Sequence, residues 1–221
     1  MPAELETRRF AAERRAMVEV QLRPRGLRDE RVLEAMARVP RHAFVEPSLW
    51  PQAYEDHPLP IAEGQTVSQP YIVALILEAM ALDSSSVVLE VGTGSGYMTA
   101  LLAELAHWTY SLERHEALAR QAEAVLQQLG YNNVSIMVRD GSEGLPGHAP
   151  FDAIAVSAAA PSIPRPLFEQ LREGGRLVVP VGPPQAQELQ LVRKHQGQPI
   201  MMSLGACAFV PLIGSRGYVS G

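Results

Sequence analysis

The stretch SVVLEVGTGSGY, residues 86–97, decides the fold. Its first half, 86–91, is a short run of apolar and β-branched residues, which is typical of a strand buried on both faces. Its second half holds three glycines within five positions, Gly92, Gly94 and Gly96. Glycines here allow a tight turn and a close approach of a ligand at the start of the following helix. The stretch therefore predicts a strand, a ligand-binding turn and a helix.

The same alternation surrounds this stretch. Strands that alternate with helices of about this length form βαβ units, so we predict an α/β fold with a mostly parallel sheet and helices on both faces. Two further strands, joined around Gly197, predict an antiparallel hairpin at the sheet edge. The expected strands are 86–91, 108–112, 134–138, 152–156, 175–180, 187–196 and 200–212, and the expected helices are 70–82, 96–106, 115–129 and 164–171.

The first seventy residues follow another pattern. Residues 3–22 contain few turn formers, and Asp29 can cap a second helix. Five prolines fall between positions 40 and 60, and a long loop inside a compact domain is more often functional than idle. We predict one domain, 1–221, with a helical extension and active-site loop at 1–69 and a cofactor-binding core at 70–221.

Composition and charge argue against several classes of protein. With 47% hydrophobic and 19% charged residues, the chain is globular rather than disordered. A net charge of −5 provides no field that attracts nucleic acid or an anionic membrane. The longest apolar stretch is interrupted and far shorter than the ~20 residues that span a bilayer. With one cysteine and no secretory leader visible, we expect a cytoplasmic protein. The six histidines lack metal-ligand spacing, so we expect no metal.

Acidic residues at three successive strand ends indicate the kind of ligand. Glu90 precedes the glycine run by two positions, Glu113 ends the second strand, and Asp140 follows the third. Glu113 is placed to accept from two ribose hydroxyls. A carboxylate such as Glu90 can offset an ammonium group, and Asp140 can accept from an adenine amino group. S-adenosyl-L-methionine has all three groups and no phosphate.

Other ligands fit less well. The dinucleotide fingerprint needs a glycine at position 97, which is Tyr97, and no Gly-Lys-Ser/Thr of a P-loop is present. Thr93 and Tyr97 exclude a hydrolase nucleophile elbow. An NAD-binding oxidoreductase and a non-catalytic protein that keeps the cofactor fold stay as alternatives of another class.

The loop GQTVSQP, residues 64–70, precedes the first sheet strand. Ser68 lies two residues before Pro70, which suggests an N-cap. The hydroxyls of Thr66 and Ser68 at a helix start can equally hold a carboxylate. Methylation of a carboxylate needs no general base, because the group is already ionised at an unperturbed pKa of about 4. Alignment and removal of water are what such an enzyme must supply.

Over residues 14–214 the chain resembles the protein-L-isoaspartate O-methyltransferases. The combination of GQTVSQP before the first strand with SAAAPSIP after the fourth is the specific part of the resemblance. Further matching stretches are MVEVQLRPRGLRDERVLEAMARVPRHAFV, VLEVGTGSGYMTALLAEL, DGSEGLP, LREGGRLVVPVG and FVPLIG. The resemblance implies a Rossmann-like class I S-adenosylmethionine-dependent methyltransferase sheet with added N-terminal helices.

The resemblance also implies roles for individual residues. Ser68 is expected to be the key active-site hydroxyl. With the acidic strand ends, the expected cofactor contacts are Thr66, Val67, Glu90, Gly92, Thr93, Gly94, Ser95, Gly96, Glu113, Arg114, Asp140 and Gly141. The expected substrate contacts are Gln65, Thr66, Ser68, Ala158, Ala159, Val210, Pro211 and Leu212.

The implied activity is methyl transfer from S-adenosyl-L-methionine to the α-carboxylate of isoaspartyl residues in damaged proteins or peptides, which leaves S-adenosyl-L-homocysteine. A close alternative is a carboxylate methyltransferase of the same fold that acts on an aspartate of a biosynthetic peptide. Four residues depart from the usual bacterial pattern, and they bear on substrate choice rather than on the reaction. They are Ala62, Met98, Arg139 and Ile213.

Overall fold

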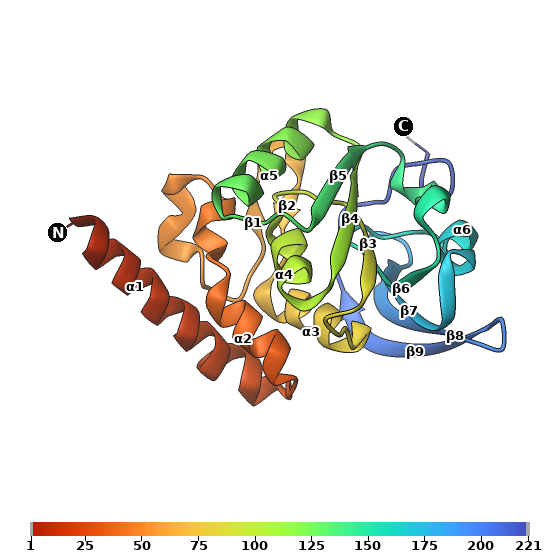
Figure 1. Ribbon diagram of the computed structural model, residues 1–221, viewed down its shortest axis with the longest axis horizontal. Helices are drawn as coiled ribbons and strands as arrows, with labels where there is room; N and C mark the ends of the chain where they lie inside the picture. The colour runs from red at the N-terminus through yellow and green to blue at the C-terminus, as the bar shows by residue number, and fades with distance from the viewer. Residues whose placement is uncertain (1, 220–221) are drawn as a thin grey trace.

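The sheet is built outward from β3 (Val87–Val91), whose apolar residues are nearly all buried. It pairs in parallel with β4 (Trp108–Glu113) on one side and β6 (Phe151–Val156) on the other. The seven-stranded order is β5-β4-β3-β6-β7-β8-β9 (Figure 1). The remaining strands are β5 (Val134–Val138), β7 (Leu171–Val181), β8 (Gln187–His195) and β9 (Gln198–Cys207).

The computed structural model describes residues 2–219, with side chains from residue 8 onward, so both ends of the expected range 1–221 lie outside the described residues. Alternate residues of the central strands face opposite layers, as the pleat requires. Val88 packs against α3 (Pro70–Met80) and α4 (Tyr97–Leu105), whereas Leu89 faces α6 (Arg165–Glu169). The mostly parallel sheet with helices on both faces is therefore confirmed.

The N-terminal helices cover the layer that contains α3 and α4 (Figure 1). α1 (Pro2–Ala16) continues through a π-helical segment, Met17–Leu22, before α2 (Glu30–Arg38). The cap predicted for α2 is confirmed, because the Asp29 carboxylate accepts from the amides of Arg31 and Val32. α5 (Glu116–Gln128) packs beside β4 and β5. No helix within residues 2–219 combines the length and apolarity that a membrane span requires.

The largest boundary differences from the sequence prediction lie near the C-terminus. The helix expected to reach residue 171 ends at Glu169, and β7 begins at Leu171 with a bulge opposite β6. The antiparallel hairpin of β8 and β9 is confirmed at the sheet edge, but β9 ends at Cys207 rather than at residue 212. Residues beyond it leave the hairpin because their backbone pairs elsewhere: Leu212 donates to Ala159 O at 2.8 Å.

The proline-rich passage is more ordered than its sequence suggests. It folds into short 3₁₀ turns and a two-residue antiparallel pair, β1 (Leu59–Pro60) with β2 (Thr66–Val67). This pair places the loop of residues 62–65 and the start of α3 beside the carboxyl end of β3. In open α/β sheets, that edge is where ligands bind.

Candidate functional site

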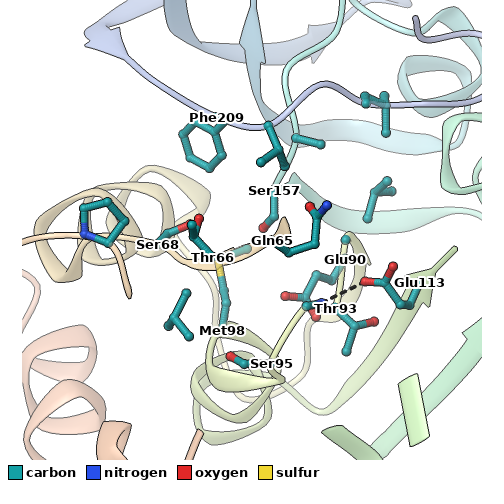
Figure 2. A pocket seen from close by; sticks show the side chains of 18 of the residues that line it. Gln65, Thr66, Ser68, Glu90, Thr93, Ser95, Met98, Glu113, Ser157 and Phe209 are labelled. Atoms are coloured by element: carbon teal, nitrogen blue, oxygen red, sulfur yellow. Dashed lines mark hydrogen bonds between the residues drawn. The ribbon is translucent and has the colours of Figure 1, made fainter. Parts of the chain in front are cut away.

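A cavity of about 470 Å³ opens at the carboxyl ends of β3, β4 and β6 (Figure 2). Its volume lies within the range of small-molecule sites. The fold brings sixteen of the predicted residues to this cavity. They are Gln65, Thr66, Val67, Ser68, Glu90, Gly92, Thr93, Gly94, Ser95, Glu113, Arg114, Gly141, Ala158, Val210, Pro211 and Leu212.

The glycine turn is fixed to the neighbouring strand. Gly92 N and Thr93 N donate to Leu112 O at 2.8 and 3.3 Å. Gly94 N donates to Glu113 Oε2 at 2.9 Å, and φ at Gly94 is +54°, in the left-handed region that glycine adopts without strain. The backbone of the turn is therefore fixed in place, and the turn residues Thr93 and Ser95 also line the cavity.

Glu113 is the anchor of this arrangement. Its Oε2 accepts from Gly94 N, and its Oε1 accepts from Arg114 N at 2.8 Å and His115 N at 3.0 Å. A carboxylate has about four acceptor positions, so three amides leave capacity for a further donor. Figure 2 shows Glu113 beside the turn that carries Thr93.

Glu90 is fully buried beneath the turn. Its Oε2 accepts from Thr99 Oγ1 at 2.6 Å and Ser111 Oγ at 2.7 Å, while its Oε1 has no donor among the described residues. Burial raises the pKa of Glu90 to about 7, against the opposing effect of the two hydroxyls. A buried acceptor without a partner is costly unless a donor arrives, and an ammonium group of a cofactor would supply one.

Three predicted residues do not line the cavity. A Cβ on Gly96 would meet Ala122 Cβ of α5 at 3.0 Å, so this glycine permits close packing of the helix against α5. The Asp140 carboxylate is engaged by Ser142 N at 2.9 Å and Ser215 N at 2.8 Å. Ala159 is buried and pairs with the backbone of residues 210 and 212.

The loop before α3 offers free hydroxyls. The N-cap of α3 is Gln69, without a side-chain cap, so the capping role suggested for Ser68 is wrong. Asp56, which lies earlier in the chain, caps the start of α3 instead. Its carboxylate accepts from Tyr71 N at 3.0 Å and from Gln69 Nε2 at 2.8 Å. Among the described residues, no group hydrogen-bonds to the Ser68 hydroxyl, which borders the cavity together with Thr66 (Figure 2).

Several lining residues were missed by sequence reasoning. Ser157 follows β6, and its place at a strand end was a usable signal. Phe209 could not be found from sequence, because it reaches the cavity only through the departure of residues 208–212 from the sheet. His115 lies two residues after the anchoring Glu113, and Met98 is the second residue of α4, the helix after the glycine turn. No cluster of three potential metal ligands occurs in the described part of the chain.

The family model described as protein-L-isoaspartate(D-aspartate) O-methyltransferase matches residues 12–217. The chain belongs to this family. A protein-L-isoaspartate O-methyltransferase of Koribacter versatilis is 55% identical over 209 residues, which cover 95% of this chain and 94% of the relative. One from Syntrophobacter fumaroxidans is 53% identical, covering 95% and 98%.

Solved structures agree with this membership in the protein-L-isoaspartate O-methyltransferase family. One protein-L-isoaspartate O-methyltransferase superposes with a TM-score of 0.82 at 29% identity, over 92% of this chain and 67% of the other. A Plasmodium falciparum protein, described as a putative family member in complex with S-adenosyl-L-homocysteine, gives 0.79 at 27% identity over 90% and 98%. The class I methyltransferase fold expected from the sequence is thereby confirmed.

Replacing Glu90 tests how its burial affects the stability of this methyltransferase at different pH values. The unfolded chain releases the Glu90 proton near pH 4.5, whereas the folded protein without cofactor holds it up to about pH 7. The free energy of unfolding should therefore fall as pH rises through this interval, by on the order of 3 kcal/mol. Glu90→Gln should abolish that decline and leave the cofactor-free protein more stable at pH 8, while its affinity for S-adenosyl-L-methionine falls.

Denaturant unfolding at pH 5, 6 and 8, with calorimetric titration of the cofactor, checks both effects. The exposed Glu123→Gln on α5 is the matched control. An unfolding profile of Glu90→Gln that keeps the wild-type decline would show that Glu90 is not its source.

Proposed function

We propose that the chain transfers the methyl group of S-adenosyl-L-methionine to the α-carboxylate of L-isoaspartyl residues in damaged proteins and peptides. The observation that carries the proposal is one cavity with two differently equipped ends. One end has the glycine turn, Glu113 and the unpaired Oε1 of Glu90. The other end has the free hydroxyls of Thr66 and Ser68.

The first end suits the cofactor. Glu113 would accept from a ribose hydroxyl at its remaining acceptor position. The unpartnered Glu90 oxygen would receive the amino group, directly or through water. The backbone of the turn and Gly141, which both line the cavity, would lie against the adenosine. Asp140 contributes through the turn that it caps with its bond to Ser142. When bound, S-adenosyl-L-methionine supplies an activated methyl group.

The second end suits an extended peptide with a short acidic branch. Residues 65–68 form one wall and residues 210–212, held by Ala159, form the other. Ser68 and Thr66 can donate to a carboxylate that enters between these walls. Phe209 and Ile72 also line the cavity and exclude water from it.

No proton has to move during the transfer. A carboxylate oxygen forms the bond to the methyl carbon as the carbon–sulfur bond breaks, and that electron pair stays on sulfur. The products are a neutral methyl ester and S-adenosyl-L-homocysteine. The contribution of the protein is alignment of the oxygen with the methyl carbon, which is proximity catalysis.

We also propose the partners, the location and the domain organisation of the enzyme. Isoaspartyl proteins are its partners, and the negative net charge supports no role for nucleic acid or membrane. No metal is needed by the chemistry, and the single cysteine supports a cytoplasmic location. Residues 1–69 and 70–221 would work as one methyltransferase domain. Of the four unusual positions, Met98 and Ile213 line the cavity and are placed to influence substrate choice.

Paired peptides that differ only in one linkage test the function. An aspartyl residue places its carboxylate one carbon further from the backbone than an isoaspartyl residue does. Displacement by about 1 Å can lower a rate on the order of a hundredfold. We expect base-labile methyl ester from the isoaspartyl peptide and little from its aspartyl twin, measured as methanol release. Equal rates on both peptides would instead favour the biosynthetic carboxylate methyltransferase, and a lack of transfer to either would refute the proposal.

Ser68→Ala separates a role in substrate orientation from a structural one. Because the Ser68 hydroxyl caps no helix here, its loss should change the free energy of unfolding by less than about 0.5 kcal/mol. Turnover of the isoaspartyl peptide should fall on the order of a hundredfold while affinity for S-adenosyl-L-homocysteine stays near wild type. Thermal melts, steady-state kinetics and calorimetry provide the three measurements, with exposed Ser85→Ala as control. Activity that declines only with the folded fraction would assign Ser68 a structural role.

A further inference from the structure

Arg41 is a fully buried arginine that lies beneath the active-site loop. Its Nη1 donates to Ala53 O at 2.6 Å, and its Nη2 donates to His57 O at 3.2 Å and to Ser68 O at 3.1 Å. All three acceptors are backbone carbonyls from residues 53–68. One side chain therefore ties together the segment that ends in Ser68.

This guanidinium has no carboxylate partner. The acidic side chains of the same segment are engaged with other groups: Glu55 with His57, Asp56 with Arg25, and Glu63 with His115. None of the ion pairs between described side chains includes Arg41, and its Nε is buried without an acceptor. A buried cation without a counter-ion is costly, yet arginine stays protonated in proteins. Asp56 and the Tyr97 ring, whose centroid lies 5.8 Å from Arg41 Cζ, stabilise the charge from a distance. The loop therefore carries a positive charge that contacts the Ser68 carbonyl and has no hydrogen-bonded carboxylate.

The charges that line the cavity are unevenly distributed. Its charged side chains are Glu90, Glu113, Arg114 and His115, and all four lie at the ends of β3 and β4. The walls proposed for the substrate, residues 65–68 and 210–212, contribute no charged side chain, and neither do their lining neighbours 208, 209 and 213. An anion held by Ser68 would find no positive group in the lining beside it.

We propose that Arg41 is a positioning residue that supplies the buried positive charge for the substrate carboxylate and holds Ser68 in place for it. The inference rests on the function proposed above. Two unit charges several ångström apart attract appreciably at the effective dielectric constant of about 20 that applies inside proteins. The charge should therefore favour a carboxylate over a neutral group of the same shape on the order of tenfold in affinity.

The test compares two peptides that carry either the α-carboxylate or an α-carboxamide on the isoaspartyl branch. Binding is measured by calorimetry with the protein saturated with S-adenosyl-L-homocysteine, whose sulfur is uncharged, so that only charges of the protein contribute. Wild type should prefer the carboxylate about tenfold or more. Arg41→Gln should lose the preference and Arg41→Lys should keep most of it, while both bind S-adenosyl-L-homocysteine as wild type does. In kinetics, Arg41→Gln should raise KM for the peptide more than it lowers kcat.

Arg176→Gln is the matched control, because Arg176 is half-buried and donates to a backbone carbonyl, Ala79 O at 2.9 Å, near the far end of α3. It should keep the wild-type preference. Equal binding of the two peptides to wild type, a preference that persists in Arg41→Gln, or its loss in Arg41→Lys would each overturn the proposal. The wild-type comparison and Arg41→Lys decide the question even if Arg41→Gln does not fold. Wild type that methylates the isoaspartyl peptide while binding both peptides equally would contradict only the role of Arg41.

Discussion

The site depends on one carboxylate that accepts hydrogen bonds from three backbone amides. Glu113 joins the end of β4 to the glycine turn after β3 through Gly94 N, and it orders its own strand end through the amides of residues 114 and 115. Hydrogen bonds from amides to an ionised carboxylate are among the stronger ones in proteins. They fix the turn before any ligand binds. The same group that would take the ribose thus also builds the surface on which the cofactor lies.

The second half of the site is attached to this frame by the N-terminal segment. The short pair β1–β2, the outside cap from Asp56 and the guanidinium of Arg41 determine where residues 65–68 lie. These three contacts are polar and partly buried, and each replaces a bond to water that the unfolded chain would make. The loop is held in place by these polar contacts rather than by apolar packing alone, which leaves its hydroxyls free for substrate.

At Glu90, the feature that suits cofactor binding lowers the stability of the cofactor-free protein. A fully buried carboxylate with one unpartnered oxygen lowers the stability of the cofactor-free protein. A ligand that donates a hydrogen bond to that oxygen would remove this destabilisation. Part of the binding free energy would therefore come from satisfying a buried acceptor that has no donor in the free protein. Destabilising groups of this kind are common at sites where function opposes maximal stability.

Local patterns in the sequence were sufficient for much of the fold. The apolar run before Gly92 predicted β3 and its neighbours, and the acidic strand ends predicted Glu90 and Glu113 at one cavity. Sequence reasoning failed where distant backbone groups decide the structure. Residues 208–212 leave β9 because Ala159 offers them hydrogen bonds, and that partner is about fifty residues away in the chain. The sequence also did not show that Gly96 packs against Ala122 or that the Asp140 carboxylate accepts from Ser142 N; the cofactor contacts predicted for both residues stay predictions.

The most direct measurement is a crystal structure of the protein with S-adenosyl-L-homocysteine. We expect a ribose hydroxyl on Glu113, the amino group facing the unpartnered oxygen of Glu90, and the sulfur directed toward Ser68. A nucleoside bound away from Glu113, or a sulfur directed away from the loop of residues 65–68, would contradict the proposed site.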